Sequence, residues 1–355
     1  MFAQIPNGYY NTATGLNGAA LKGALHDIID NHQEINYDAV KEAVQILDED
    51  PGNPEYIQLI YKGVSIPKSD FNAGVDGWNR EHIWPQSHGD FGTNNGPGTD
   101  LHAIRPADVT VNTSRSDKDF DNGGEPHYEA TGCYSDDDSW EPRDAVKGDV
   151  ARAVFYMCVR YEGDITGEPD LEILDDITSS SSGNGYLGLI GAMLQWHAQD
   201  PVDQSETDRN NLVYFNEAFP NLDQGNRNPF IDHPEYAGMI WGEQLVQEPT
   251  GHATGFSTQT ITLTWTDATG TFNPDGYLIR MSDTGFDNIP VPQDGVAVDD
   301  DFNNKNVPFG TGRCVFGGLT PNTMYYFKIF GHSGTGTSID YKTGDGVQQV
   351  GILAM

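Results

Sequence analysis

Three ordered segments in the first third of the chain indicate its fold and its chemistry. They are Trp78-Asn79-Arg80-Glu81-His82-Ile83-Trp84-Pro85, Asp100-Leu101-His102-Ala103-Ile104-Arg105-Pro106 and Val111-Asn112-Thr113-Ser114-Arg115. Hydrolysis of a phosphodiester requires a base for water, a cation against the developing charge and a positive group on the nonbridging oxygens. Each segment alone is a weak signal, but together they offer all three requirements.

The residue types within these segments predict a role for each polar side chain. His82 supplies an imidazole that titrates near neutral pH, as a general base should. Glu81 and Asn112 supply the hard oxygen ligands that a water-rich Mg²⁺ site prefers. The structural alternatives are an ion pair between Glu81 and Arg80 and a helix-start hydrogen bond from Asn112. Three of the chain's 19 Lys and Arg residues fall here as phosphate-binding candidates, namely Arg80, Arg105 and Arg115.

These segments resemble the endonuclease I family of bacterial periplasmic and secreted nucleases, whose active site is a ββα-metal, or His-Me, finger. In that family a Glu-His pair opens the site, a D-L-H-N-L-x-P-like segment follows, and V-N-x-x-R lies on the helix. The resemblance implies that His82 is the general base and that Arg115 lies close to the phosphate. It also implies that Glu81 and Asn112 bind Mg²⁺, with Mn²⁺ or Ca²⁺ able to replace it.

The resemblance extends over nearly all of the first domain. Residues 147–157 resemble the family's helix after the finger, and Gln224-Gly225-Asn226-Arg227-Asn228-Pro229-Phe230 resembles a late segment. Family members with a long insertion carry an arginine there that steadies the product phosphate. The corresponding residues 88–99 are short and hold no arginine. The substitutes for that role, in descending order of preference, are Arg115, Arg105 and Arg227.

Several of these residues also have structural alternatives. Asp100 and His102 either brace the finger by hydrogen bonds, which we favour, or support the metal ligands from behind. Arg105 precedes a proline and either contacts phosphate or has a structural role. Arg227 either contacts phosphate or satisfies the carbonyl groups of its own Asn-rich loop.

The length of the chain and a change of pattern near residue 250 predict two domains. The 355 residues exceed the size at which a single hydrophobic core stops growing. Residues 1–249 mix helical patterns with Gly/Asn-rich loops, and apolar spacing predicts helices over residues 16–30, 150–161 and 186–198. We therefore expect an endonuclease I-like catalytic domain over residues 1–249.

Residues 250–355 have the pattern of an all-β sandwich. Apolar and polar residues alternate in Ile261-Thr262-Leu263-Thr264-Trp265 and in Tyr325-Tyr326-Phe327-Lys328-Ile329, with turn residues between such runs. With Gly276-Tyr277-Leu278-Ile279-Arg280, these runs resemble a fibronectin type III module. The expected fold class is α+β, a mixed helical domain that contains the finger followed by a small all-β sandwich.

The formal net charge of −34 argues against a polyanionic partner, because general electrostatics would repel it. Two effects answer this objection. A local arginine cluster with a bound divalent cation inverts the potential at one site, and high salt screens charges beyond about 10 Å. We interpret the acidity as a surface adapted to a salty medium.

Other sequence features bear on the compartment. No stretch approaches the roughly 20 apolar residues that a membrane span needs. The three cysteines, Cys133, Cys158 and Cys314, allow at most one intramolecular disulfide, and Cys158 is expected to be a buried thiol. The start, Met1-Phe2-Ala3-Gln4 before Ile5-Pro6, resembles the tail of a removed export signal. We expect a secreted or periplasmic monomer.

The sequence therefore predicts a Mg²⁺-dependent endonuclease that cuts DNA, with RNA as a further substrate, and leaves 5′-phosphate ends. Little sequence preference is expected, because affinity would come from backbone phosphates. Two alternatives stay open: a surface adhesion protein whose sandwich is the working part, and a metal phosphodiesterase for small substrates. The sequence does not identify a partner for the sandwich.

Overall fold

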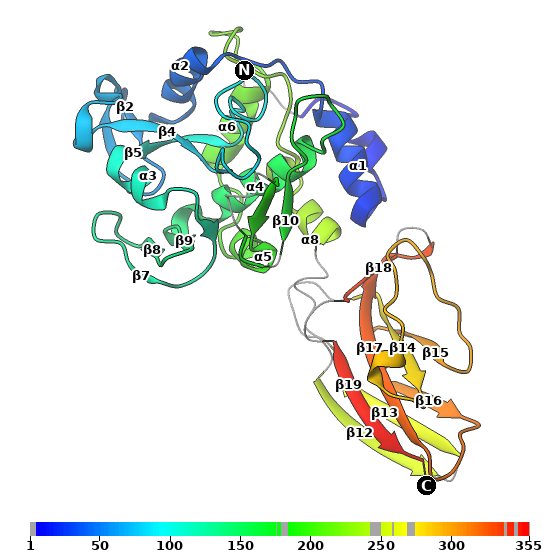
Figure 1. Ribbon diagram of the computed structural model, residues 1–355. Coiled ribbons are helices and arrows are strands. Elements are labelled where there is room, and N and C mark those ends of the chain that lie inside the picture. Colours follow the sequence, from blue (N-terminus) through cyan, green and yellow to red (C-terminus); the bar gives the residue numbers. More distant parts are fainter. Residues whose placement is uncertain are drawn as a thin grey trace. The chain divides into compact units, whose positions relative to one another are not determined.

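The computed structural model describes residues 5–174, 176–178, 184–241, 250–257, 259–267, 274–336, 339–343 and 347–354 (Figure 1). The chain divides into two compact units, Met1–Gly15 with Leu21–Ala237 and Leu16–Ala20 with Gly238–Met355. The expected boundary between residues 249 and 250 borders a segment outside the described residues and stays a prediction. The tail that resembles an export signal, residues 1–4, also lies outside them.

Helices and short strands alternate over the first 241 residues. The α-helices are Gly18–Ile29 (α1), Tyr37–Leu47 (α2), Val109–Arg115 (α3), Lys147–Arg160 (α4), Ile190–Gln199 (α5), Gln204–Tyr214 (α6), Pro229–Asp232 (α7) and Glu235–Trp241 (α8). The strands are Glu49–Asp50 (β1), Asn53–Gln58 (β2), Ser65–Pro67 (β3), Trp78–His82 (β4), Ile104–Asp108 (β5), Asp119–Phe120 (β6), Glu125–Pro126 (β7), Tyr134–Ser135 (β8), Ser139–Glu141 (β9), Glu172–Leu174 (β10) and Tyr186–Gly188 (β11). The strands form four small sheets, ordered β1-β2-β3, β4-β5, β6-β9-β8-β7 and β10-β11.

Two of the three predicted helices are present as expected, and the third begins later. α1 and α4 lie within or beside the predicted ranges 16–30 and 150–161. The prediction of a helix from residue 186 was wrong at its start, because Tyr186–Gly188 pairs in parallel with Glu172–Leu174. Helix α5 begins only at Ile190.

The three motif segments, residues 78–85, 100–106 and 111–115, fold into a ββα unit. β4 pairs antiparallel with β5, so that Glu81 stands opposite Arg105 in the register, and α3 follows β5 directly. The side chain of Asp108 accepts hydrogen bonds from the backbone N–H groups of Thr110 (3.0 Å) and Val111 (3.2 Å). This is an N-cap, and such a cap contributes about 1 kcal/mol to the start of a helix. The unit thereby brings the end of β4 beside α3.

Helix α2 packs against this ββα unit. Its first turn is capped by Asn36, whose side chain accepts a hydrogen bond from the backbone N–H of Ala39 at 3.0 Å. Its buried face, with Val40 and Val44, joins one hydrophobic cluster with Trp78 of β4. Full burial of an aliphatic side chain contributes roughly 1.5–3 kcal/mol, so this contact fixes the start of α2 beside β4.

The C-terminal residues form an all-β sandwich. Its strands are Thr250–Ser257 (β12), Thr260–Thr266 (β13), Gly276–Ser282 (β14), Asn304–Pro308 (β15), Arg313–Gly317 (β16), Met324–Ser333 (β17), Asp340–Tyr341 (β18) and Gln348–Leu353 (β19). One sheet has the order β12-β13-β16, and the other has the order β15-β14-β17-β18 with β19 also paired to β17. Trp265, Tyr277 and Phe327 are buried in the core between them. The two predicted alternating runs therefore lie on β13 and β17, and the run Gly276–Arg280 lies on β14.

The cysteines are free thiols, and all three are buried. Cys158 is therefore a buried thiol, as the sequence predicted. Among the described residues, no helix combines the length and the apolar character of a membrane span.

Candidate active site

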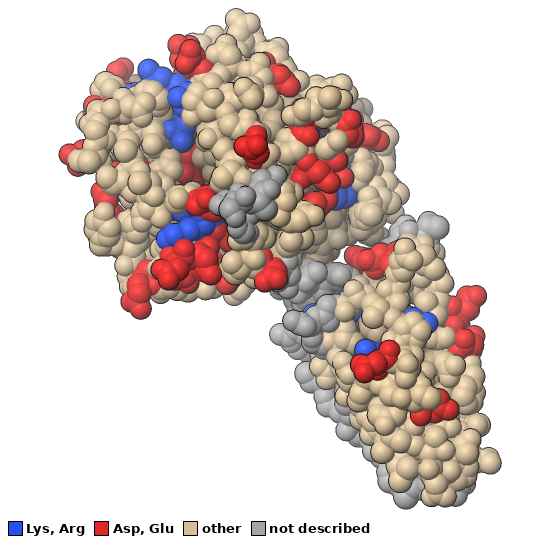
Figure 2. Space-filling view, in the orientation of Figure 1, with Lys and Arg blue, Asp and Glu red and all other residues tan. Residues whose placement is uncertain are grey.

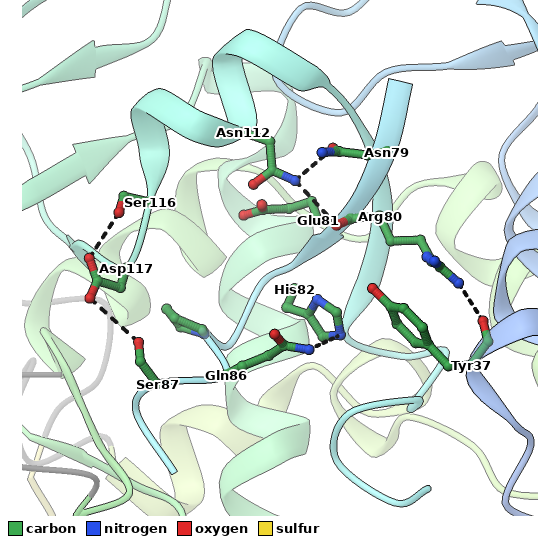
Figure 3. A pocket seen from close by; sticks show the side chains of 11 residues that line it. Tyr37, Asn79, Arg80, Glu81, His82, Gln86, Ser87, Asn112, Ser116 and Asp117 are labelled. Atoms are coloured by element: carbon green, nitrogen blue, oxygen red, sulfur yellow. Dashed lines mark hydrogen bonds between the residues drawn. The ribbon is translucent and has the colours of Figure 1, made fainter. Parts of the chain in front are cut away.

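The ββα unit and the start of α2 enclose a pocket of about 460 Å³ (Figure 3). Its walls come from α2, β4, the loop after β4 and α3. The lining residues are Tyr37, Asn79, Arg80, Glu81, His82, Pro85, Gln86, Ser87, Asn112, Ser116 and Asp117. The pocket therefore brings together four predicted site residues, Arg80, Glu81, His82 and Asn112.

Glu81 is buried at the floor of the pocket and is held through one carboxylate oxygen. Its Oε1 accepts a hydrogen bond from the Tyr61 hydroxyl at 2.7 Å and lies 3.3 Å from Nε of Arg115. Burial raises the pKa of the Glu81 carboxyl, whereas the charge of Arg115 and the hydrogen bond from Tyr61 lower it. The described residues form no hydrogen bond to Oε2, so this oxygen is available to a ligand.

Asn112 lies on α3, and its amide nitrogen fixes its orientation. Nδ2 donates to Oδ1 of Asn79 at 2.8 Å and to the backbone carbonyl of Arg80 at 3.2 Å. These bonds leave Oδ1 as the group that faces the pocket, and Figure 3 shows it on the same side as the carboxylate of Glu81. The alternative of a helix-start hydrogen bond does not apply, since Asp108 caps α3.

These two side chains suit a hard divalent cation that keeps most of its water. Mg²⁺ is commonly bound through one or two protein oxygens and several waters. Glu81 and Asn112 offer such oxygens, and Asn112 Nδ2 is already committed elsewhere. Within the described part of the chain, no group of three or more His, Cys, Asp or Glu side chains is arranged to hold a metal. These residues therefore do not form a metal site in which protein side chains replace all of the water ligands.

His82 ends β4 and lines the same pocket. Its Nε2 lies 3.0 Å from the carbonyl oxygen of Gly98 and 3.2 Å from the amide nitrogen of Gln86. The shorter contact decides the tautomer, because a carbonyl oxygen only accepts. Nε2 therefore carries the proton, and Nδ1 carries the lone pair.

The surroundings of His82 keep its imidazole neutral. Burial lowers its pKa to about 4, and the positive charges of Arg80 and Arg115 act in the same direction. The hydrogen bond to Gly98 acts in the opposite direction. A neutral imidazole with a lone pair on Nδ1 is able to accept a proton from water at neutral pH.

The structure corrects the expectation that Arg115 contacts phosphate. Its side chain is fully buried, with Nη2 donating to the carbonyl of Ile83 and Nη1 to that of Ser116, each at 2.9 Å. Its Nε faces Glu81, and its guanidinium carbon lies 4.4 Å from the centre of the Phe120 ring. Arg115 therefore acts on Glu81 and the backbone, not on a ligand in the pocket.

Arg105 and Arg227 also lie away from the pocket. Arg105 is held by Asp48 at 2.9 Å and by Asp149 at 3.3 Å. Arg227 is buried and forms a two-point ion pair with Asp232, at 2.5 and 2.7 Å. The predicted phosphate contact fails for both, because each guanidinium is already paired with carboxylates of the protein.

Arg80 is the candidate arginine that does line the pocket. It makes no ion pair with Glu81, which was the structural alternative for that carboxylate; Arg115 takes that place. Its guanidinium carbon lies 3.4 Å from the centre of the Tyr37 ring, and Nη1 donates to the Tyr37 carbonyl.

Asp100 and His102 are buried outside the pocket. The Asp100 carboxylate accepts hydrogen bonds from the hydroxyls of Tyr156 and Tyr161, both at 2.9 Å, and from the backbone N–H of His102. Burial lowers the pKa of His102 to about 4, and its Nε2 lies 3.4 Å from the carbonyl of Asn226. These contacts are those of a bracing role, and neither residue touches the pocket.

Sequence reasoning missed several residues that shape the site. Tyr37 stands on α2, for which the Asn36 cap and the spacing of Val40 and Val44 were the available signals. Tyr61 lies outside every quoted motif, and no local pattern marks it. Gln86 follows the Glu-His motif by only a few residues and contacts the imidazole.

Comparisons with known proteins identify the family of each part of the chain. The sequence model of the family described as Endonuclease I matches residues 17–235, and that of the fibronectin type III domain matches residues 247–343. The extracellular ribonucleases of Bacillus amyloliquefaciens and Bacillus subtilis (strain 168) are each 52% identical over 236 residues, which cover 66% of this chain and 78% of each relative. Among solved structures, an FN3 domain of human collagen XX is 18% identical over 30% of this chain and 91% of that chain, with a TM-score of 0.21. Because the first family model spans more than half of the chain, this protein belongs to the endonuclease I family of nucleases, and its C-terminal domain is of the fibronectin type III class.

Proposed function

We propose that this protein is an exported, divalent-metal-dependent endonuclease that hydrolyses RNA and DNA with little sequence preference. The observation that carries the proposal is the convergence of His82, Glu81 and Asn112 on one pocket. Export and action on RNA are supported by the two relatives, which are named extracellular ribonucleases. DNA remains a proposed substrate on the resemblance to the family.

In this proposal each side chain has one task. His82 accepts a proton on Nδ1 from the water that attacks phosphorus, while the Nε2–H donated to Gly98 keeps the ring in that tautomer. Glu81 and Asn112 would hold Mg²⁺, which when bound supplies Lewis-acid stabilisation of the charge on the phosphate oxygens. Tyr61 keeps Glu81 oriented; burial and the negative charge of Glu81 hold the pKa of its phenol well above the ordinary value, so it remains a donor.

Such a mechanism leaves a 5′-phosphate, because the 3′ oxygen departs after in-line attack by water. The sugar 2′-hydroxyl takes no part, which is why both RNA and DNA are proposed as substrates. Recognition through backbone phosphates carries little sequence information.

The test uses the purified full chain with supercoiled plasmid, RNA and a chromogenic small diester, each in Mg²⁺, in EDTA, and in EDTA followed by excess Mg²⁺ or Mn²⁺. Both polymers should be cut, EDTA should stop cleavage, and added metal should restore it. Polynucleotide kinase should label the products only after phosphatase treatment, which reports 5′-phosphate ends. Intact RNA and DNA with every common divalent ion would overturn the proposal, and cleavage of the small diester alone would favour the small-substrate phosphodiesterase.

A further inference from the structure

The basic residues of the first unit fall into two groups. Most are tied to carboxylates of the protein, as Arg105, Arg152 and Arg227 are. Within the described ranges, no ion pair joins Arg80 or Lys41 to Asp or Glu. Figure 2 shows Lys and Arg side chains gathered over α2 and β4, on a face where Asp and Glu predominate elsewhere. These two cations are therefore available to an external anion.

Tyr37 fixes the position of Arg80. The Tyr37 ring supports the guanidinium at 3.4 Å, and the Tyr37 carbonyl accepts a hydrogen bond from Nη1 of Arg80. The same ring stacks with the imidazole of His82, with centroids 6.0 Å apart and planes inclined by 20°. In Figure 3 the ring stands between the imidazole and the guanidinium. One aromatic side chain thus sets the spacing between the base and the cation.

A second aromatic ring links Arg80 to Lys41. The guanidinium carbon of Arg80 lies 5.3 Å from the centre of the Phe71 ring, and Nζ of Lys41 lies 4.8 Å from it. Lys41 follows Tyr37 by four residues on α2, so both project from the same side of that helix. The result is a strip of two cations on two rings, which begins in the pocket.

We propose that this strip, Arg80 on Tyr37 and Lys41 on Phe71, binds the sugar-phosphate backbone of the substrate. Arg80 grips the phosphate in the pocket, Lys41 contacts a neighbouring phosphate, and Tyr37 is the positioning residue for Arg80. A guanidinium has five N–H donors, and Arg80 spends one on Tyr37, so several remain for phosphate oxygens. The assignment rests on the proposed function and supplies the phosphate-holding arginine that Arg115, Arg105 and Arg227 do not provide.

The experiment compares Arg80→Gln, Lys41→Gln, Tyr37→Leu and Tyr37→Phe with the wild-type chain and with Arg313→Gln, an exposed arginine of the sandwich that serves as charge-matched control. One arm measures kcat/KM on RNA in Mg²⁺ over a range of NaCl concentrations. The other measures fluorescence anisotropy of a short labelled single-stranded DNA in EDTA over the same range. Thermal unfolding of every variant reports whether it folds.

Arg80→Gln should lower kcat/KM by roughly 10- to 100-fold, the worth of one charge-assisted hydrogen-bond pair. In the binding arm, Arg80→Gln and Lys41→Gln should each flatten the plot of log affinity against log salt by about 0.7. A purely structural role would not flatten this plot. Tyr37→Leu should reproduce part of the Arg80→Gln loss, whereas Tyr37→Phe should match wild type because it keeps the ring and the carbonyl.

Wild-type salt dependence and kcat/KM in Arg80→Gln would overturn the phosphate assignment, and unchanged salt dependence in Lys41→Gln would remove Lys41 from the strip. Equal losses in Tyr37→Phe and Tyr37→Leu would overturn the positioning role. Absence of cleavage by wild type and Arg313→Gln would instead count against the proposed function. The metal-free binding arm still tests the strip in that case, so the two failures are distinguishable.

Discussion

The floor of the pocket, at Glu81, and its wall, at Arg80, each combine an arginine with a tyrosine, but the two arginines have different partners. On the floor, Tyr61 and the buried Arg115 hold Glu81, and the guanidinium also donates two hydrogen bonds to backbone carbonyls. On the wall, Tyr37 supports the half-buried Arg80, which spends one N–H on a carbonyl and pairs with no carboxylate of the described residues. Burial and partners, rather than the motif that contains an arginine, therefore decide whether that arginine holds the protein or is available to the substrate.

The largest effect on activity should come from replacing His82, the proposed general base. We expect His82→Ala to lower the cleavage rate by roughly 10³-fold, because general-base catalysis contributes on that order. His233→Ala is the matched control, since that histidine pairs with Glu235 and does not line the pocket. Wild-type turnover by folded His82→Ala protein would rule out the proposed mechanism.

Substitution on the floor of the pocket should lower the stability of the protein. Arg115→Met removes one partner of a buried ion pair and leaves Glu81 uncompensated, so the free energy of unfolding should fall by about 3–5 kcal/mol. Arg80→Gln, on the wall, should lower it by only about 1–2 kcal/mol, because one hydrogen bond and the contact with the Tyr37 ring are lost. Urea denaturation of the two variants measures both quantities. Equal stability losses would erase the distinction between floor and wall.

Metal binding tests the two proposed oxygen donors of the pocket, Glu81 and Asn112. Asn112→Ala should weaken the affinity for Mn²⁺ by roughly 10- to 100-fold, the range found when groups that support a metal are lost. Titration calorimetry with the full chain measures this affinity, and Asp138→Asn in the exposed acidic loop is the control for nonspecific attraction. An unchanged affinity in Asn112→Ala would exclude Oδ1 as a ligand.

The smallest effect is expected at Tyr61. Tyr61→Phe removes the hydrogen bond to Oε1 of Glu81 but retains the Arg115 pair, so the free energy of unfolding should fall by about 1 kcal/mol. The affinity for Mn²⁺ should fall less than it does in Asn112→Ala. If Tyr61→Phe lowered the free energy of unfolding more than Arg115→Met does, the phenol rather than the guanidinium would be the main support of Glu81.

The sequence predicted the centre of the site better than its surroundings. Glu81, His82 and Asn112 converge because β4, β5 and α3 are short, consecutive elements whose register is set locally. Two fibronectin-like strands were predictable for a similar local reason, since alternation of apolar and polar residues marks β13 and the first half of β17. The division into two domains was indicated by the change of pattern near residue 250.

The roles of the arginines were not predictable, because their partners lie far along the chain. Arg105 forms an ion pair with Asp48, and no local sequence pattern around either residue predicts this pair. Tyr37 reaches the pocket only because α2 packs on Trp78, which is a tertiary contact. Tyr61 likewise reaches Glu81 from a separate segment. The start of α5 was misplaced because pairing with β10 overrides the helical pattern at Tyr186–Gly188.

The shortness of the proposed strip, which holds only Arg80 and Lys41, has a consequence for how a polymer would be digested. With 53 acidic and 19 basic residues, the chain repels a phosphate backbone over most of its surface. A long strand would therefore be held at a few phosphates and released after each cut, without sliding to the next site. Digestion should be distributive rather than processive, and intermediate fragments of all lengths should accumulate before short oligonucleotides dominate.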